Sequence, residues 1–204
     1  MNVKGRPVGI VLAAGASSRM GAPKALLEAD GVTFVARLVE TLRQGGCASV
    51  VVVAAAGSGA VASEVVRCGA RLVVNPEGRG GQIGSLRAAL DFLGQLDEPP
   101  AAMVFTPVDN PAVTSDTVGR LIEGWRVSRA LIVMPRHGEE RGHPVLADMT
   151  IADEFLATGL AEGARTVVRR DPARVLEVPV DDAATVDDID TPRRYRDRFG
   201  GSHG

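Results

Sequence analysis

A loop of small residues and two cations follows the first apolar run of the chain, and it could hold the phosphates of a nucleotide. Its candidate residues are Leu12, Ala13, Ala14, Gly15, Arg19 and Lys24. Small residues let a backbone approach a ligand closely, and successive N–H groups can form an anion-binding concavity. The loop is neither a Walker A loop nor a Rossmann fingerprint, because Gly-Lys-Ser/Thr and G-x-G-x-x-G are both absent. On glycine content alone, an ordinary surface βα loop explains the segment equally well.

Carboxylates that could hold a divalent cation occur at two later points of the chain. Asp109 follows an apolar run that ends near Pro107. Mg²⁺ takes one or two carboxylates together with substrate phosphates, so Asp109 could hold it against an α-phosphate. The alternative is a turn aspartate in front of Asn110 and a proline. The acidic cluster 187–190 could bring a second carboxylate, although Asp190 could equally be the N-cap of a terminal helix.

Two further polar segments are candidates for ligand contacts. Gln82 and Ser85 stand at the start of a predicted helix, whose N-terminus favours anions, although Ser85 could be only the N-cap. The second segment consists of Arg141, Gly142, His143 and Pro144. We interpret it as a wall beside an acceptor molecule and not as a source of a general base. A phosphate acceptor is already ionised at neutral pH, and in-line attack mainly needs positioning and charge neutralisation.

The elements that must position these residues alternate between short apolar runs and amphipathic stretches, which is the α/β signature. The predicted strands are residues 8–13, 50–55, 71–74, 103–106, 131–134 and 174–179. The predicted helices are residues 33–44, 60–68, 85–96, 115–125, 151–159, 164–169 and a short one through 191–195. We expect a three-layer α/β fold: one open, mostly parallel, Rossmann-like sheet with helices on both faces. Ligands bind beyond the carboxyl ends of such strands.

Length and composition exclude several classes of protein. The 204 residues favour one domain, which we place at 1–199 with a flexible tail at 200–204. A net charge of −2 and 3% aromatic residues offer neither a basic face nor stacking platforms, so we expect no nucleic-acid partner. No run has the length of a membrane span, and the first residues lack a secretory signal pattern. We expect a cytoplasmic protein whose two cysteines, Cys47 and Cys68, are small buried residues.

Five sequence blocks resemble, in order, the signature of the MobA-like nucleotidyltransferases, and most closely the molybdenum cofactor cytidylyltransferase branch. The first block is LAAGxSxRMGxxK, from Leu12 to Lys24. The others lie at 75–86, 107–111, 141–145 and 187–192, so the resemblance spans Gly9 to Tyr195. One position departs from the pattern. After GHPV the family usually has a larger aromatic residue, whereas this chain has Leu146, which puts the acceptor side in question.

The resemblance implies a fold of the nucleotide-diphospho-sugar transferase type and a role for each candidate residue. It implies that Lys24 and Arg19 offset charge on the triphosphate, and that Gln82 and Ser85 contact the nucleobase or ribose. Asp109 is the implied metal aspartate. Asp188 is our first choice for the second metal ligand, with Asp190 close behind. Arg141 to Pro144 then border the acceptor.

The implied reaction is a Mg²⁺-dependent transfer of CMP from CTP to molybdenum-bearing molybdopterin, with release of pyrophosphate. Cytosine is favoured because guanylyl-transferring relatives usually carry glycine at the position of Ala14. A molybdenum apoenzyme that receives the cofactor is an implied partner. The alternatives are a guanylyltransferase for the same cofactor, a cytidylyltransferase for a sugar or polyol phosphate, and a non-catalytic chaperone that hands over cofactor. The last alternative predicts a missing lysine or metal aspartate, whereas Lys24 and Asp109 are both present.

Overall fold

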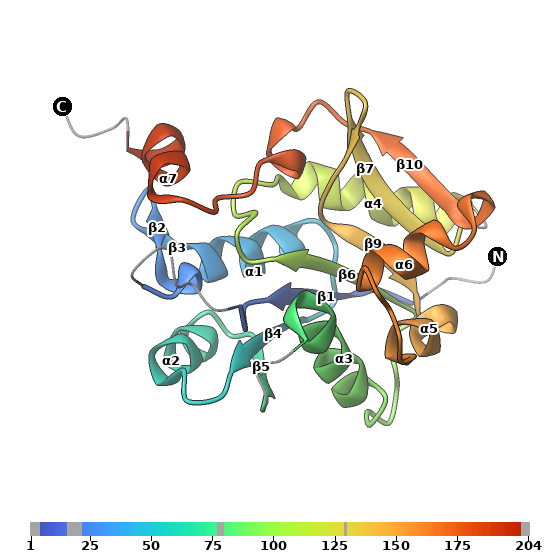
Figure 1. The fold of residues 1–204 in the computed structure, drawn as a ribbon, viewed down its shortest axis with the longest axis horizontal. Coiled ribbons are helices and arrows are strands. Elements are labelled where there is room, and N and C mark those ends of the chain that lie inside the picture. The colour runs from blue at the N-terminus through green and yellow to red at the C-terminus, as the bar shows by residue number, and fades with distance from the viewer. Residues whose placement is uncertain (1–4, 16–21, 77–79, 129, 201–204) are drawn as a thin grey trace.

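A computed structural model describes residues 5–15, 22–76, 80–128 and 130–200, and its centre is a mostly parallel sheet (Figure 1). The main strands are β1 (Val8–Leu12), β4 (Val50–Ala55), β5 (Arg71–Asn75), β6 (Ala102–Pro107), β7 (Ile132–His137), β9 (Val145–Asp148) and β10 (Val175–Pro179). Their order across the sheet is β10-β7-β9-β6-β1-β4-β5, and the two-residue β8 (Glu140–Arg141) pairs with β7. The predicted open, mostly parallel sheet is therefore confirmed.

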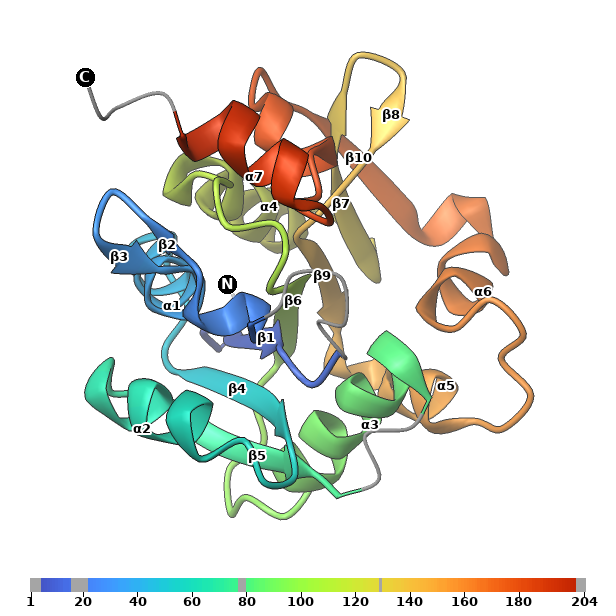
Figure 2. The ribbon, with the colours of Figure 1, turned by 60° about the vertical axis from the view of Figure 1, so that its left-hand side comes forward.

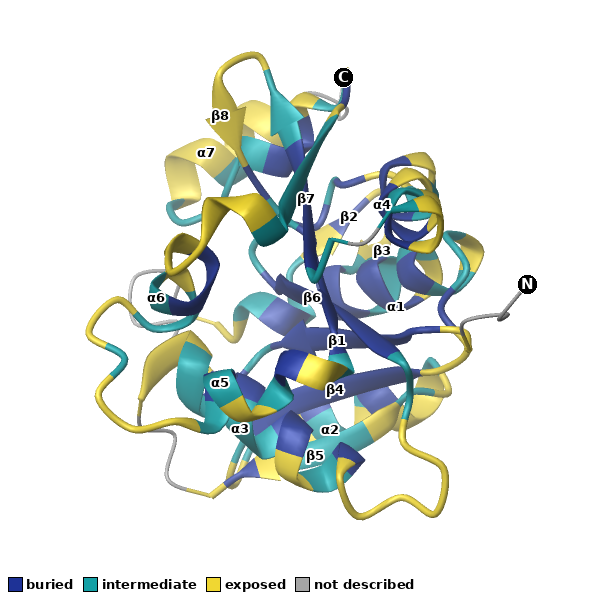
Figure 3. Ribbon diagram, turned by 90° about the vertical axis from the view of Figure 1, so that its right-hand side faces the viewer, coloured by how far each residue is buried: buried dark blue, intermediate teal, exposed yellow. Residues whose placement is uncertain are grey.

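Side chains of successive residues in the central strands point to opposite faces of the sheet, and each face is covered by helices. On β1, Val11 packs into one apolar cluster and Ile10 into the other, as the two-residue period of a strand requires. The first cluster joins the sheet to α1 (Phe34–Gln44), α2 (Gly59–Arg67) and α4 (Ser115–Val127). The second joins it to α3 (Gly81–Leu93), α5 (Ala152–Leu156) and α6 (Ala164–Arg169). The central strands β1 and β6 are buried over their whole length (Figure 3).

Strand β9 is a central strand that the sequence analysis did not predict. It lies antiparallel between β6 and β7, and all four of its residues are buried. Four residues are too few for periodicity to separate a strand from a buried loop. The small hairpin of β2 (Glu28–Ala29) and β3 (Val32–Thr33) was also missed. Its turn has Asp30 and Gly31 at positive φ, 54° and 74°, as a two-residue hairpin turn requires.

The start of α3 differs from the sequence prediction in a way that affects the site. The helix begins at Gly81 and not at Ser85, after Gly80 with φ 82°. Ser85 therefore lies inside the helix, where its hydroxyl donates to the carbonyl of Gly81 at 3.4 Å. The N-cap alternative for Ser85 is wrong. The sequence analysis placed the helix start too late because glycine, with its conformational freedom, is a poor helix former on average.

The C-terminal helix α7 (Pro192–Phe199) folds back over the N-terminal half of the chain. Thr191 is its N-cap and accepts a hydrogen bond from the backbone N–H of Arg194 at 3.2 Å, so Asp190 is left out of the cap. Figure 2 shows α7 beside the β2–β3 hairpin, where the hydroxyl of Tyr195 donates to the carbonyl of Glu28 at 2.6 Å. Within the described ranges, no helix has the length and apolar character to cross a membrane.

Candidate active site

The carboxyl ends of β1 and β6 lie side by side and open into a small pocket. Leu12 and Pro107 are paired in the strand register, so the segments that follow them must diverge from neighbouring points. A cavity of about 170 Å³ lies there. Its lining includes the predicted residues Leu12, Gly15, Lys24, Gln82, Ser85 and Asp109. The structure thus brings together residues that are up to about a hundred positions apart, as the strand-end rule for open sheets predicts.

Among the described residues, two of the predicted nucleotide residues do not line this pocket. Ala13 follows β1 and continues its pairing with β4, because its backbone N–H donates to the carbonyl of Val53 at 2.8 Å. Ala14 is buried, with 7% of its surface exposed, and lies outside the lining. Arg19 falls outside the described residues. The structure therefore supports the small-residue loop as one wall of the pocket through Leu12 and Gly15.

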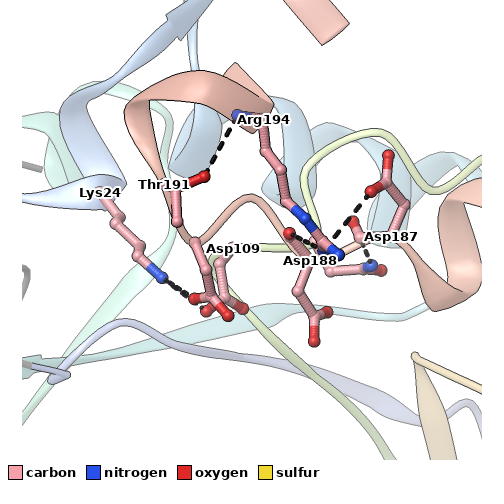
Figure 4. A network of polar contacts seen from close by, with 8 residues as sticks. Lys24, Asp109, Asp187, Asp188, Thr191 and Arg194 are labelled. Carbon is pink, nitrogen blue, oxygen red and sulfur yellow. Dashed lines mark hydrogen bonds and ion pairs between the residues drawn. The ribbon is translucent and has the colours of Figure 1, made fainter. Parts of the chain in front are cut away.

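Lys24 makes the central polar contact of the site. Its Nζ donates to Asp109 Oδ2 at 2.9 Å and to Asp190 Oδ1 at 2.5 Å (Figure 4). Burial lowers the pKa of the Lys24 ammonium, but hydrogen bonds and charges from Asp190 and Asp109 outweigh it, so the pKa lies above its ordinary value. Lys24 is thus a cation held between two carboxylates in the lining of the small cavity.

The acidic segment 187–190 is held against the end of β6 by residues that the sequence analysis did not assign to the site. The backbone N–H of Ile189 donates to the carbonyl of Asp109 at 2.7 Å. The fully buried amide of Asn110 donates to the carbonyls of Ala184 and Asp187, at 2.6 and 3.3 Å. Asn110 was considered only as a turn residue. Its position after a buried strand, next to Asp109, was the available signal for this structural role.

Asp188 completes the acidic group from the side of a second, larger cavity. Burial raises the pKa of its carboxyl, and the charges of Asp109 and Asp190 raise it further. Figure 4 shows this carboxyl directed away from Arg194, which donates instead to the Asp188 backbone carbonyl at 2.9 Å. Asp188 is therefore close enough to Asp109 and Asp190 for their negative charges to act on one another.

A divalent cation fits these residues if a substrate completes its coordination. Asp109 Oδ1 is buried and has no hydrogen-bond partner, so one carboxylate oxygen is available. Yet in the described part of the chain no three His, Cys, Asp or Glu side chains are grouped closely enough to hold a metal by themselves. Mg²⁺ commonly uses one or two carboxylates and takes its remaining oxygens from phosphates and water. Asp109 with Asp188 or Asp190 meets that requirement.

The larger cavity, of about 1240 Å³, borders the smaller one. Leu12 and Gln82 line both spaces. Of the four predicted acceptor residues, Arg141, Gly142 and His143 line this cavity, whereas Pro144 is buried behind them. A Cβ at Gly142 would lie 2.1 Å from the carbonyl oxygen of Thr185, so only glycine fits there.

His143 lies in the cavity wall in a setting that disfavours its charged form. Its backbone N–H donates to the carbonyl of Thr185 at 2.8 Å, which fixes the wall to the segment before Asp188. Burial lowers the pKa of the ring to about 4, and the guanidinium of Arg165 on α6 adds to the shift. The sequence analysis did not include Arg165 because none of the motifs it used covers that residue.

Comparisons with known proteins place this geometry in context. A model described as the MobA-like NTP transferase domain matches residues 9–175. The chain is 34% identical over 191 residues to nicotine blue oxidoreductase of Paenarthrobacter nicotinovorans, across 90% of this chain and 91% of the relative. It is 32% identical over 151 residues to a protein of Rhodopirellula baltica named probable molybdenum cofactor guanylyltransferase, across 71% and 68% of the two chains.

A solved structure shares nearly the whole fold. The protein Rv0371c of Mycobacterium tuberculosis superposes with a TM-score of 0.82 and 26% identity, across 96% of this chain and 99% of that chain. The same protein has been crystallised in complex with manganese, and that form superposes with a TM-score of 0.77. The fold is therefore shared with a solved protein over almost its full length.

Proposed function

The chain belongs to the MobA-like NTP transferase family, and we propose that it transfers CMP from CTP to the phosphate of molybdenum-bearing molybdopterin. The observation that carries the proposal is the position of Lys24. Its ammonium lies 2.9 Å from Asp109 Oδ2 and 2.5 Å from Asp190 Oδ1, where β1 and β6 end. A lysine and carboxylates at one pocket mouth supply the charges that phosphates and their divalent cation require.

In the proposed reaction, an oxygen of the acceptor phosphate attacks the α-phosphorus of the nucleotide. The bond from the α-phosphorus to the bridging oxygen breaks, and pyrophosphate leaves with the bonding electrons. Lys24 exchanges its carboxylate partners for phosphate oxygens and offsets the charge on the leaving group. A Mg²⁺ held by Asp109 and Asp188 would neutralise charge on the α- and β-phosphates. No general base is needed, which agrees with the low pKa of His143, about 4.

The two cavities suit the two substrates of such a reaction. The smaller one lies between the small-residue loop and the start of α3, where Gln82 and Ser85 can reach a base or ribose. The larger one has room for a polycyclic acceptor and meets the smaller at Leu12 and Gln82. Asp109 lines the smaller cavity and Asp188 the larger. The proposed reaction centre lies at their boundary.

The choice of CTP over GTP rests on the loop sequence alone. Ala14 stands where guanylyl-transferring relatives usually carry glycine. Because Ala14 is buried and does not line the small cavity, we propose that its methyl group acts by shaping the loop and not by touching the base. The relative named guanylyltransferase makes GTP the main rival. The same acceptor would serve either nucleotide.

A second candidate function comes from the relative named nicotine blue oxidoreductase, which matches 90% of this chain. That function predicts a redox reaction of nicotine blue with a hydride donor, for which a reduced nicotinamide nucleotide can serve as the probe. It gives no role to a lysine set between two carboxylates, so we rank it below transfer. An absorbance assay with both compounds tests it directly. Turnover there, with no pyrophosphate released from any nucleoside triphosphate, would replace the proposed function.

Pyrophosphate release tests the proposed function. Purified protein with Mg²⁺ is given each nucleoside triphosphate with molybdenum-molybdopterin, molybdopterin alone, a sugar phosphate or no acceptor. We expect release with CTP and molybdenum-molybdopterin, at a rate that falls about a hundredfold or more in Asp109→Asn. Release only with a sugar phosphate would show that the acceptor is a sugar phosphate and not molybdopterin. Release with GTP in place of CTP would change the assigned base from cytosine to guanine. No release with any pair would refute nucleotidyl transfer.

A further inference from the structure

The larger cavity contains three arginines, and carboxylates hold only two of them. Arg141 donates through Nε to Glu177 at 2.8 Å. Arg169 pairs with Glu162 at 2.5 Å. Arg165, one helical turn before Arg169 on α6, is exposed and has no ion-pair partner among the described residues. Its guanidinium is therefore free to bind an anion that enters the cavity.

The acidic groups of the same cavity do not neutralise Arg165. Glu162 is paired with Arg169. Asp188 lies toward the acidic group of the reaction centre, where the charges of Asp109 and Asp190 act on it. Glu140, on the short strand β8, is exposed and also lines the cavity. None of these carboxylates lies within ion-pair distance of Arg165 in the described chain. An anion can therefore approach Arg165 without first displacing a carboxylate.

His143 adds a second hydrogen-bond donor to the same wall. Its Nδ1 is buried and has no partner, so a proton there would be an orphaned N–H in the interior. Buried N–H groups without partners are rarer in proteins than buried acceptors without partners. The neutral ring is therefore expected to carry its proton on Nε2, since the partner of one ring nitrogen sets the tautomer. Nε2 is not among the buried atoms that lack a partner, and His143 lines the cavity, so we infer that Nε2 is the nitrogen that faces the cavity.

Arg165 and His143 line the same cavity, and the guanidinium contributes to the low pKa of the imidazole. The two come from different elements, Arg165 from α6 and His143 from the segment between β8 and β9. Each presents N–H groups toward one space and neither presents an acceptor. Phosphate oxygens accept hydrogen bonds from arginine in a bidentate manner and from a neutral imidazole N–H in a single bond. A pair of donors of this kind selects an oxyanion.

We propose that Arg165 and the Nε2–H of His143 form an oxyanion subsite that binds the phosphate of the acceptor molecule. The identification of the ligand as the acceptor rests on the proposed function, whereas the subsite itself rests on the cavity and its donors. Through this subsite the protein holds the acceptor phosphate between α6 and the segment between β8 and β9, in the cavity that Asp188 also lines. The remainder of the acceptor occupies the rest of the 1240 Å³ cavity.

Histidine NMR tests the subsite without any turnover. The chain has three histidines, so the ring signals of His143 in ¹⁵N-labelled protein can be assigned by comparison with His143→Gln. Inorganic phosphate is the probe. We expect an Nε2–H tautomer whose signals shift in a saturable way with phosphate. Loss of a bidentate, charged donor should weaken this affinity about tenfold in Arg165→Met. Arg165→Lys keeps the positive charge but loses the bidentate geometry, so its phosphate affinity should lie between those of wild type and Arg165→Met.

Arg120→Met is the matched control, because Arg120 is an exposed arginine of α4 that lines neither cavity. It should leave the phosphate response of His143 unchanged. An Nδ1–H tautomer, an unresponsive His143 signal, or equal weakening by Arg120→Met and Arg165→Met would overturn the subsite. These outcomes hold whether or not nucleotidyl transfer is observed.

Steady-state kinetics then test the identity of the ligand. Arg165→Met should raise the KM for the acceptor about tenfold and leave the KM for CTP and the kcat close to wild type. An equal rise in the KM for CTP would show that Arg165 acts on the nucleotide, and would overturn its assignment to the acceptor. If no acceptor supports turnover while phosphate still binds at His143, the subsite stands and the proposed function fails.

Discussion

Acidification should destabilise this protein through His143. Burial and the neighbouring Arg165 lower the pKa of the ring to about 4 in the folded state. In an unfolded chain a histidine titrates at about 6.5. Between those two values the unfolded state binds a proton that the folded state does not. The free energy of unfolding therefore falls as the pH falls through this window, and the contribution of His143 is fully present only above it.

The two pKa values set the size of the effect. At pH 5 the protonation of His143 in the unfolded chain should lower the free energy of unfolding by about 2 kcal/mol relative to pH 7.5. Near pH 4 the loss should reach about 3 kcal/mol. Domains of this kind are stable by only about 5–15 kcal/mol, so the loss is a large share of the total.

Urea unfolding at pH 7.5, 6.0 and 5.0, followed by the fluorescence of Trp125, measures the loss. Trp125 is the single tryptophan and is fully buried, so its emission reports the folded core. The measurement compares wild type with His143→Gln. The variant is expected to start less stable at pH 7.5 but to lose about 2 kcal/mol less by pH 5. Acidic groups titrate in both proteins, so the difference between the slopes isolates His143.

Arg165→Met serves as a second comparison, because removing the guanidinium relieves part of the pKa shift. Its stability should fall with pH less steeply than wild type and more steeply than His143→Gln. Parallel loss of stability in wild type and His143→Gln would refute the conclusion that His143 is buried in its neutral form. It would also remove the support that the neutral ring lends to the oxyanion subsite.

Three further predictions concern the reaction centre. Asp109→Asn should keep the fold but lower turnover about a hundredfold or more, as loss of metal-mediated charge stabilisation would, and a wild-type rate at saturating Mg²⁺ would remove Asp109 from the site. Lys24→Met should weaken CTP binding while Mn²⁺, followed by electron paramagnetic resonance, binds more tightly without nucleotide, because the ammonium no longer competes for Asp109 and Asp190. Unchanged Mn²⁺ affinity would refute that competition. Wild-type protein should prefer CTP in competition with GTP, and Ala14→Gly should relax the preference; a wild-type preference for GTP would contradict the cytidylyl assignment.

Several elements and site residues were predictable from the sequence because local pattern and topology agree. The nearly continuous apolar runs of β1 and β4 suit strands that are covered on both faces, and both were found where predicted. The four-residue spacing of Phe34, Leu38 and Leu42 predicted α1, and all three side chains are buried. Lys24 and Asp109 follow neighbouring strands of one parallel sheet, so the strand-end rule was enough to bring them together.

The tertiary structure alone decided which carboxylate meets Lys24 and how His143 is charged. Asp188 and Asp190 differ by two positions in one acidic cluster, and no local pattern separates them. They are separated by the anchoring of the segment, since Ile189 binds the carbonyl of Asp109 and Asn110 binds that of Asp187. Likewise the pKa of His143 depends on Arg165, which belongs to a different element. Sequence patterns report propensity and periodicity along the chain, whereas pairing, burial and charge depend on distances between segments, and only the packed fold sets those distances.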